Sequence, residues 1–397
     1  MSKVKEVFLT LDIGLWSLDF GLWTFFFRLC KMRSVMTEDK SNADVPVAQP
    51  LVEVKRGSIT ESRHRGHIVA VDGDGQIVAQ LGAAQLVTYL RSSSKPFQAI
   101  PLIASGAADH FGFDEKEIAI ACGSHNGETA HTETVARMLR KIGLDARHLK
   151  CGAHEPYSAD AARELRERGE QPTVLHNNCS GKHTGMLALA LHLDAPIETY
   201  DEPSNPVQLN IARRIEQFSG VPIEDVAVGI DGCGVPTFGV TVRAMALMYA
   251  RLVAPPADFD EATREACQRI VAAMTKYPEM IGGSAERLDT VVMQSEPGGI
   301  VSKVGAEGVY TAGVLPCAEW PRGLGLALKI EDGEDRRARP TVVIESLRQL
   351  SVLKDGALEA VRPYASFTIE NRRGDEVGEV RASFELQRIK KGLSAED

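Results

Sequence analysis

Turn signals near both ends of the sequence constrain the fold most, because each one interrupts a stretch of apolar residues. Near the start, an Asp-Gly-Asp-Gly turn at 72–75 lies inside the apolar stretch 66–81, which is a strong hairpin signal. Near the end, Asp-Gly at 332–333 separates the runs 324–330 and 340–344. We therefore predict a mixed α/β (α+β) fold, with an antiparallel sheet built from both chain ends and a helical subdomain between them.

The stretch between the two hairpin signals has apolar residues at helical spacing. The predicted helices span residues 95–105, 128–143, 160–168, 180–191, 205–218, 242–250 and 261–274, and a further helix follows at 345–353. Pro101 should kink or break the first of these helices, because proline lacks the N–H group that a helix interior requires.

The composition is that of a soluble globular protein acting on small molecules. The 397 residues include 45 Lys and Arg against 54 Asp and Glu, a formal charge of −9, whereas a nucleic-acid-binding surface would be basic. Seven cysteines in so long a chain do not form the pattern of a disulfide scaffold. A reducing, cytoplasmic location is the prediction that follows.

The first 50 residues differ from the rest and are predicted to be an extension of the domain. Residues 7–30 are largely apolar, but Asp12 and Asp19 interrupt them, and each would cost roughly 2.5–3.5 kcal/mol near a bilayer centre. The extension is either upstream sequence from a start codon placed too early, with Met36 as the true start, or a membrane-associated segment. Residues 51–390 are predicted to form one domain, followed by a tail at 391–397.

The sequence Arg-Ser-Ser-Ser-Lys-Pro at 91–96 places the Ser92 hydroxyl three residues before the Lys95 amine. Positions i and i+3 share a helix face, and a partly desolvated lysine can remove the proton that makes serine a poor nucleophile. Ser93 and Ser94 compete for the same role, and Arg91 is a candidate ligand for a substrate carboxylate. The alternative is a polar turn that opens a helix.

A second polar turn, Cys-Gly-Ser-His-Asn-Gly at 122–127, follows the apolar run 118–121. Ser124 could supply a second hydroxyl to a site, but the spacing alone favours a turn in which Ser124 or Asn126 caps the following helix. Lys303 is either a second amine of the site or, as its local sequence favours, an exposed residue on a strand.

Two cysteine-containing motifs suggest a metal ion. Cys179 and His183 share a helix face at i, i+4, Lys182 lies between them, and Cys233 follows Asp231 in a Gly-rich turn after the apolar run 226–230. The paired Cys-x-x-Cys spacing of a closed zinc site is missing. Buried structural cysteines are therefore the equal alternative.

Taken together, the ordered motifs resemble the class 3 (rhizobial-type) bacterial L-asparaginases, the asparaginase II family. The resemblance covers about residues 50–390. The matching segments are 52–57, 61–66, Arg91–Gln98, Cys122–Glu128, Asn177–Gly185, Asp231–Pro236 and Lys303–Tyr310.

The resemblance implies a fold similar to that of the serine β-lactamases and glutaminases, in which an S-x-x-K element lines the active site. By that resemblance Ser92 is the nucleophile, Lys95 is its base, and Ser124 and Lys303 form a second serine–lysine pair. It also implies a homodimer.

The same resemblance implies a Zn²⁺ ion held by Cys179, Lys182 and Cys233, with Asp231 nearby and His183 as a neighbour of the substrate. A lysine ligand must be neutral to donate, and the adjacent cation would depress its pKa.

The function predicted from these residues is hydrolysis of L-asparagine to aspartate and ammonia, with Arg91, His183 and Asp231 as substrate-binding residues. One alternative is a zinc-dependent amidohydrolase in which metal-activated water attacks. Another is a non-catalytic amino-acid-binding protein. Glutamine is a rival substrate, because one methylene changes binding by only about 1–3 kcal/mol.

Overall fold

A computed structural model describes residues 47–389 of the chain, except residue 286. Most of the predicted extension, including Met36, and the predicted C-terminal tail therefore lie outside the described residues. Within the described ranges, no helix combines the length and the apolar character that crossing a membrane would require.

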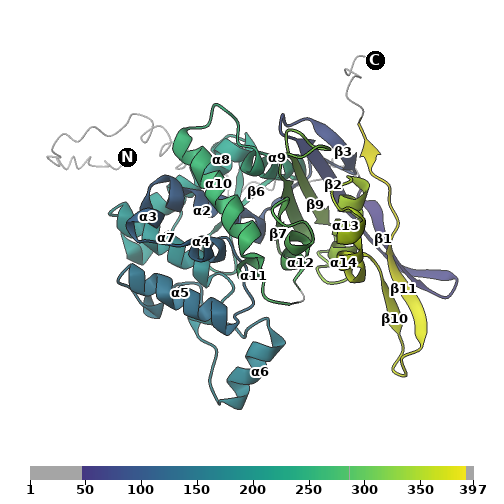
Figure 1. Cartoon of the computed structure of the whole chain (residues 1–397), viewed down its shortest axis with the longest axis horizontal. Helices are drawn as coiled ribbons and strands as arrows, with labels where there is room; N and C mark the ends of the chain where they lie inside the picture. The colour runs from purple at the N-terminus through teal and green to yellow at the C-terminus, as the bar shows by residue number, and fades with distance from the viewer. Residues whose placement is uncertain (1–46, 286, 390–397) are drawn as a thin grey trace, which may run out of the picture.

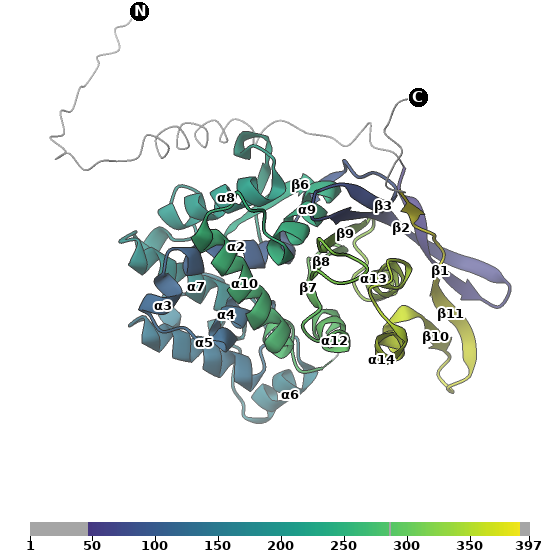
Figure 2. The ribbon, with the colours of Figure 1, turned by 45° about the horizontal axis from the view of Figure 1, so that its top comes forward.

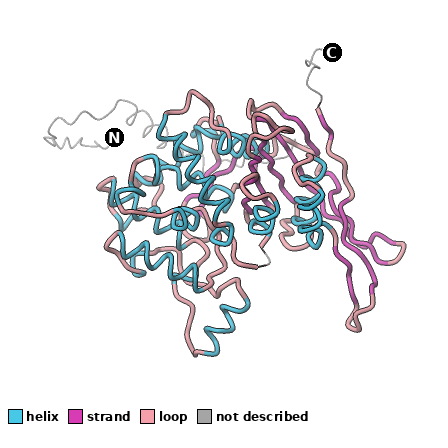
Figure 3. Tube along the Cα trace, in the orientation of Figure 1, coloured by secondary structure: helices cyan, strands magenta, loops and turns pink. Residues whose placement is uncertain are grey.

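The fold is mixed, with a helical half beside a large antiparallel sheet (Figures 1 and 3). The sheet has the order β10-β11-β1-β2-β9-β8-β7, with β3 paired to β2 and β12 paired to β3. Both chain ends contribute strands, as predicted. The strands are β1 (Gln49–Arg56), β2 (Ile59–Asp72), β3 (Ile77–Leu81), β7 (Ile300–Val304), β8 (Val309–Val314), β9 (Leu324–Ile330), β10 (Phe367–Glu370), β11 (Glu376–Ala382) and β12 (Gln387–Arg388).

The first predicted hairpin is confirmed. Strands β2 and β3 are antiparallel neighbours, and the Asp72 carboxylate accepts hydrogen bonds from the backbone N–H groups of Asp74 and Gln76 within the turn. A short acidic side chain that bonds the backbone two residues ahead is the usual reason for Asp at such a turn.

The second predicted hairpin is wrong. Strand β9 pairs with β2 and β8, and residues 340–344 lie inside helix α13 (Ala338–Gln349). The apolar residues of this segment fit a helix, because Val343 and Leu347 lie four residues apart on one helix face and are both buried in the core that includes residues of the sheet. Pro340 is tolerated because it falls in the first turn, where no intrahelical N–H bond is lost.

The central part of the sheet is buried on both faces, and the side chains of strand β2 there alternate between two cores. Val69 and Val71 of β2 join the core shared with the helical half, whereas Ile68 and Ala70 join the core beneath α13. This alternation is the period-two geometry of a strand. Helices α12 (Leu288–Ser295) and α14 (Asp355–Ala365) lie on the same side as α13.

Helix α9 (Val242–Val253) packs against the opposite face of the sheet, and glycines let it approach closely. Gly313 and Gly325 are directly paired across β8 and β9. A Cβ atom at Gly325 would lie 1.8 Å from the carbonyl oxygen of Ala246, and one at Gly313 would lie 2.8 Å from that of Tyr249. The sheet face beneath α9 therefore has no room for side chains at these two positions.

Gly325→Ala is expected to destabilise the protein by at least about 1–3 kcal/mol, the range found for overpacked cores, because backbone rather than a flexible side chain must move. The matched control is Gly356→Ala in α14, where a Cβ would meet nothing within 4 Å. Urea unfolding midpoints of both variants measure the effect. Equal stability of the two variants would contradict the close approach of α9.

The helical half is built around α2, α7 and α8, with a small antiparallel sheet, β4-β6-β5, beside it (Figure 2). The prediction was that Pro101 kinks or breaks helix α2; the helix continues through Pro101, so a break is wrong. Nearly every residue of α2 is buried, and this packing stabilises the helix in spite of the proline. The elements of this half are β4 (Val87–Tyr89), α2 (Lys95–Ala104), α3 (Ala107–His110), α4 (Glu115–Ala121), α5 (Thr129–Lys141), α6 (Ala159–Glu167), α7 (Ser180–His192), α8 (Pro206–Ser219), β5 (Ala227–Ile230), β6 (Pro236–Thr241), α10 (Glu261–Lys276) and α11 (Pro278–Ile281).

Candidate active site

The three consecutive serines differ in what their hydroxyl groups contact. They lie in a 3₁₀ turn, Arg91–Ser94, that leads into α2. Ser93 Oγ donates to the carbonyl of Leu90 at 2.6 Å, and Ser94 Oγ donates to the carbonyl of Arg91 at 2.8 Å. Both of these serines are buried, whereas Ser92 lines a cleft. Ser92 is therefore the serine of the three that is available to a ligand.

The backbone at this turn is strained. Arg91 adopts φ of +51°, in the left-handed region that costs a non-glycine residue of order 1–3 kcal/mol. Such strain persists only where the surroundings fix it, and it is concentrated at functional sites. The strained residue, Arg91, directly precedes Ser92 in the chain.

Lys95 is 1% exposed at the start of α2, and its amine lies among three oxygen atoms. Nζ donates to the carbonyl of Gly123 at 2.6 Å and to that of Asn178 at 3.1 Å, and it lies 2.9 Å from Ser124 Oγ. Burial lowers the pKa of Lys95, and the nearby Cys179 sulfur opposes that shift in part. The amine thus contacts the hydroxyl of Ser124, and no hydrogen bond to Ser92 Oγ is found among the described residues.

Ser124 lies in the turn that follows α4, and this turn is held against α11, a segment distant in the sequence. The Ser124 N–H donates to the carbonyl of Ile281 at 2.7 Å, and a Cβ on Gly123 would lie 2.5 Å from the carbonyl of Met280. The turn does not cap α5, because Glu128 occupies the N-cap position. The capping interpretation of Ser124 is therefore wrong.

Lys303 lies on β7, as expected, but its side chain is fully buried, so its interpretation as an exposed strand residue is wrong. Its Nζ lies 3.3 Å from Asp289 Oδ2 and 3.0 Å from the carbonyl of Val304. Asp289 also accepts from the backbone N–H of Val304 and from Ser302 Oγ. The structure therefore pairs Lys303 with Asp289, and a bond to Ser124 is not among its contacts.

Burial and neighbouring charges oppose each other at both members of this pair. Burial lowers the pKa of Lys303 to about 8, although the negative charge of Asp289 opposes the shift. For Asp289, burial alone would raise the pKa, but the charges of Lys303 and Arg287 hold it below the ordinary value. A buried amine with a pKa near neutrality is suited to proton transfer.

The predicted metal ligands come together between the start of α7 and the turn after β5. The thiols of Cys179 and Cys233 are hydrogen-bonded to each other, and Lys182 Nζ lies 3.0 Å from Cys233 Sγ. Among the described residues, no group of three or more His, Cys, Asp and Glu side chains is placed to hold a metal ion. A zinc ion here would therefore need the Lys182 amine as a third ligand.

The charges of this cluster are coupled. The hydrogen bond from Cys233 is the main reason that the pKa of Cys179 lies well below its ordinary value. Burial pushes the pKa of Lys182 down, but the two sulfur atoms outweigh it and raise the pKa. A thiolate beside an ammonium group is the arrangement that results, and a divalent cation would displace the lysine proton.

His183 is completely buried in α7. Its Nδ1 lies 2.7 Å from the hydroxyl of Tyr200, and its Nε2 has no hydrogen-bond partner among the described residues. Burial, with the charges of Lys182 and Lys95, holds the pKa of His183 well below its ordinary value, so the ring is neutral. The predicted substrate-binding histidine is thus fully buried and is not among the residues that line the cleft.

The other two predicted substrate-binding residues contact each other. Arg91 Nε donates to Asp231 Oδ1 at 2.9 Å, in an ion pair that is mostly buried. Burial would raise the pKa of Asp231, but Lys182 and Arg91 together lower it. The charge of Arg91 is therefore already balanced by a carboxylate of the protein.

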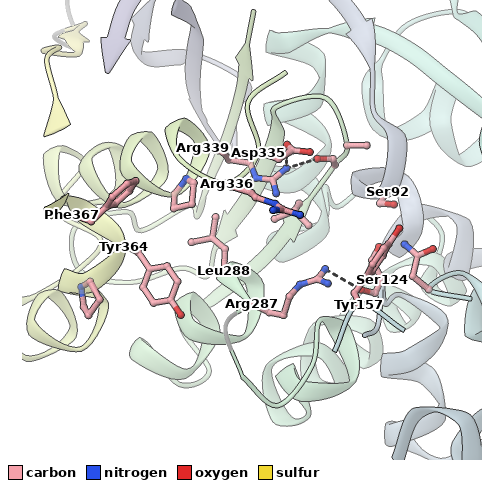
Figure 4. A pocket seen from close by; sticks show the side chains of 16 residues that line it. Ser92, Ser124, Tyr157, Arg287, Leu288, Asp335, Arg336, Arg339, Tyr364 and Phe367 are labelled. Atoms are coloured by element: carbon pink, nitrogen blue, oxygen red, sulfur yellow. Dashed lines mark hydrogen bonds and ion pairs between the residues drawn. The ribbon is translucent and has the colours of Figure 1, made fainter. Parts of the chain in front are cut away.

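A cleft of about 690 Å³ opens in front of the two serines. Figure 4 shows Ser92, Ser124 and Tyr157 on one side of it and the guanidinium groups of Arg287 and Arg336 projecting between its walls. The far wall comes from α14 and β10. The cleft thus lies between the helical half and the sheet, where segments far apart in the sequence meet.

Sequence reasoning did not identify Asp289, Arg287 or Asn178. Asp289 is the buried partner of Lys303, Arg287 lines the cleft, and Asn178 offers only its backbone carbonyl to Lys95. The Gly-Gly pair before Ser284 was a usable signal in the sequence. Paired glycines indicate a close approach of the backbone to another segment, and here they precede Arg287 and Asp289.

Two serine hydroxyls and buried amines beside one cleft define a site suited to nucleophilic hydrolysis. A family model, L-asparaginase II, matches residues 52–382 of this sequence. The chain therefore belongs to the L-asparaginase II family, which supports an amide hydrolase acting on a small molecule.

Comparison with solved structures finds likenesses at low identity. A probable glutaminase from Bacillus subtilis, complexed with 6-diazo-5-oxo-L-norleucine, is 12% identical with a TM-score of 0.33, over 86% of this chain and 99% of that chain. A β-lactamase from Burkholderia ambifaria is 15% identical with a TM-score of 0.35, over 72% of this chain and 93% of that chain. No curated protein sequence matches this one.

Proposed function

We propose that this enzyme hydrolyses the side-chain amide of L-asparagine to L-aspartate and ammonia by serine–lysine nucleophilic catalysis. The observation that carries the proposal is the buried Lys95 amine, 2.9 Å from Ser124 Oγ in the cleft that Ser92 also lines. Membership in the L-asparaginase II family supports the same substrate.

The contacts of Lys95 suggest how a proton leaves Ser92. Carbonyl oxygens can only accept, so the carbonyls of Gly123 and Asn178 take the two N–H groups of a neutral amine. The lone pair then faces the Ser124 hydroxyl. In this proposal Ser124 passes its proton to Lys95 and receives the proton of Ser92, whose oxygen attacks the amide carbon.

The second half of the reaction reverses the proton flow. The C–N bond breaks, ammonia leaves with the proton held by Lys95, and an ester joins Ser92 Oγ to the acyl group. Water then attacks the ester, gives its proton back through the same groups, and aspartate leaves. Lys303, the second buried amine, is proposed to assist these proton transfers.

Zinc is part of the proposal as a bound ion that fixes the site. Cys179, Cys233 and a deprotonated Lys182 would hold it, and thiolate and amine donors are suited to Zn²⁺. When bound, the ion would supply a positive charge near the substrate. By holding these ligands, the ion would also align the start of α7. This would keep the Asn178 carbonyl in place as a hydrogen-bond acceptor for Lys95.

The test is ammonia release from L-asparagine and L-glutamine by the purified enzyme, before and after treatment with a zinc chelator. We expect asparagine turnover that persists, with a several-fold loss at most, after the metal content falls to zero. Complete and zinc-reversible loss would favour metal-activated water, and absence of ammonia release from both amides would favour an amino-acid-binding protein.

The pH dependence of kcat/KM should report the ionisation of the Lys303 amine. We expect kcat/KM to rise as the pH increases through about 8, because only the neutral amine can accept a proton. Asp289 raises the pKa of Lys303, so Asp289→Asn should shift this rise to lower pH. Stopped-time ammonia assays from pH 6 to 10 measure it. A rise that stays in place in Asp289→Asn would assign it to another group.

The homodimer and the cytoplasmic location stay predictions. Sedimentation at several protein concentrations checks the first, and fractionation of the source cells checks the second. None of the six described cysteines forms a disulfide bond, which is the state that a reducing compartment maintains.

A further inference from the structure

Arg287 presents an unused set of donors to the cleft beside the serines. It directly precedes α12, and its Nη2 donates to the backbone carbonyl of Ser124 at 3.0 Å, while Nη1 donates to the side-chain oxygen of Asn126. A guanidinium has five N–H groups, so these two bonds leave three of them available. In Figure 4 the group lies in the cleft, directed toward Ser124.

The charge of Arg287 also lacks an ion-pair partner among the described residues. Arg91 is paired with Asp231, and Arg339 is paired with Asp335. Asp289 interacts electrostatically with Arg287, but its carboxylate already forms an ion pair with Lys303. A positive group that lines a cleft without a carboxylate of its own is suited to an anionic ligand.

Residues 283 and 284 contact the same turn that Arg287 contacts. A Cβ on Gly283 would lie 2.3 Å from the Asn126 side chain, so the two segments are in direct contact. The N–H of Ser284 donates to the Glu128 carboxylate at 3.0 Å. Residues 283 and 284 and the Arg287 guanidinium thus all contact the turn that carries the proton-relay residue Ser124.

We propose that the Arg287 guanidinium binds the α-carboxylate of the substrate. The inference rests on the proposed amide hydrolysis and narrows its substrate class to short amides with a free carboxylate. Because Arg287 is bonded to the residue that carries the Ser124 hydroxyl, the carboxylate and the amide of the substrate must be only a few bonds apart, as in an amino-acid side-chain amide.

The decisive comparison uses L-asparagine and its α-methyl ester, which keeps the amide and removes the negative charge. Ammonia release is measured for the wild-type enzyme, Arg287→Gln, Arg287→Lys and Arg336→Gln. We expect Arg287→Gln to raise KM for asparagine by roughly 10–100-fold, the range for a lost charged hydrogen bond, and to leave KM for the ester unchanged. Arg287→Lys should keep part of the preference for asparagine.

Arg336→Gln is the matched control, because it removes the same charge from another position on the same cleft. We expect it to preserve the preference of the enzyme for asparagine over the ester. An equal loss of preference in Arg336→Gln would show a general field effect and overturn the proposal. So would an Arg287→Gln variant whose activity falls equally on both substrates, because that result assigns Arg287 to positioning Ser124.

A binding measurement separates this inference from the proposed reaction. Calorimetric titration of Ser92→Ala with L-aspartate should show binding that is lost in Ser92→Ala/Arg287→Gln. If the wild-type enzyme releases no ammonia but this binding pattern is found, the proposed reaction fails and the carboxylate site stands. If Ser92→Ala binds no aspartate, the carboxylate site is overturned.

Discussion

Ser92→Ala is expected to reduce ammonia release from L-asparagine by at least about 10³-fold while the protein stays folded and its measured metal content matches that of the wild type. A missing nucleophile leaves only binding and electrostatic effects, and single losses of this kind in other serine hydrolases have reached that size or more. The Ser92 hydroxyl lines the cleft, and no hydrogen bond to it is found among the described residues, so its removal leaves no buried group unpaired.

The neighbouring serine provides the control. Ser94→Ala removes a hydroxyl of the same type two residues away, whose bond to the carbonyl of Arg91 is structural. It should keep activity within a few-fold of the wild type, with a small loss in melting temperature. Activity retained by Ser92→Ala would refute serine catalysis, and equal losses in both variants would show that the turn, rather than one hydroxyl, is what matters.

Lys95→Arg is expected to lose activity to a similar extent, because arginine keeps the charge and cannot give up its proton at any accessible pH. Lys95→Met, which removes the charge at similar length, should be equally inactive. Loss of the amine leaves the carbonyls of Gly123 and Asn178 without their donor, so a fall in stability of about 1–3 kcal/mol should accompany it.

The control for these variants is Lys150→Arg, at a half-exposed lysine paired with Asp201. It should be fully active. Thermal melts show whether each variant is still folded at the assay temperature, and so separate unfolding from loss of catalysis. If Lys95→Arg stays active, the role of Lys95 is to supply a positive charge, and the proton path through Ser124 is wrong.

Helices and the first hairpin could be predicted from sequence because the signals are local. The Asp72–Gln76 turn and the apolar period of the segments that form α5, α8 and α10 are set by residues that are neighbours in the chain. The segment 340–344 was misassigned because a short apolar run fits both a strand and a helix. Packing of Val342 and Leu347 against the sheet decided between them.

The motifs indicated most of the site residues but not their pairing. Lys95 and Ser124 are hydrogen-bonded although 29 residues separate them, and Lys303 is bonded to Asp289 on another element. No local pattern carries such information, because these contacts depend on how the helical half packs against the sheet. The proposed role of Arg287 could not be predicted from the sequence for the same reason, because it depends on the cleft that this residue lines.

The residue types and their order along the chain were enough to indicate the family, the sheet formed by both ends and the chemistry of hydroxyl, amine and thiol. Tertiary structure alone decided that the hydroxyls of Ser93 and Ser94 are occupied by backbone carbonyls, buried Lys303 against Asp289 and left Arg287 in the cleft without an ion-pair partner among the described residues. The physical reason is that burial and partnership, which fix hydroxyl availability and amine ionisation, are properties of the packed molecule.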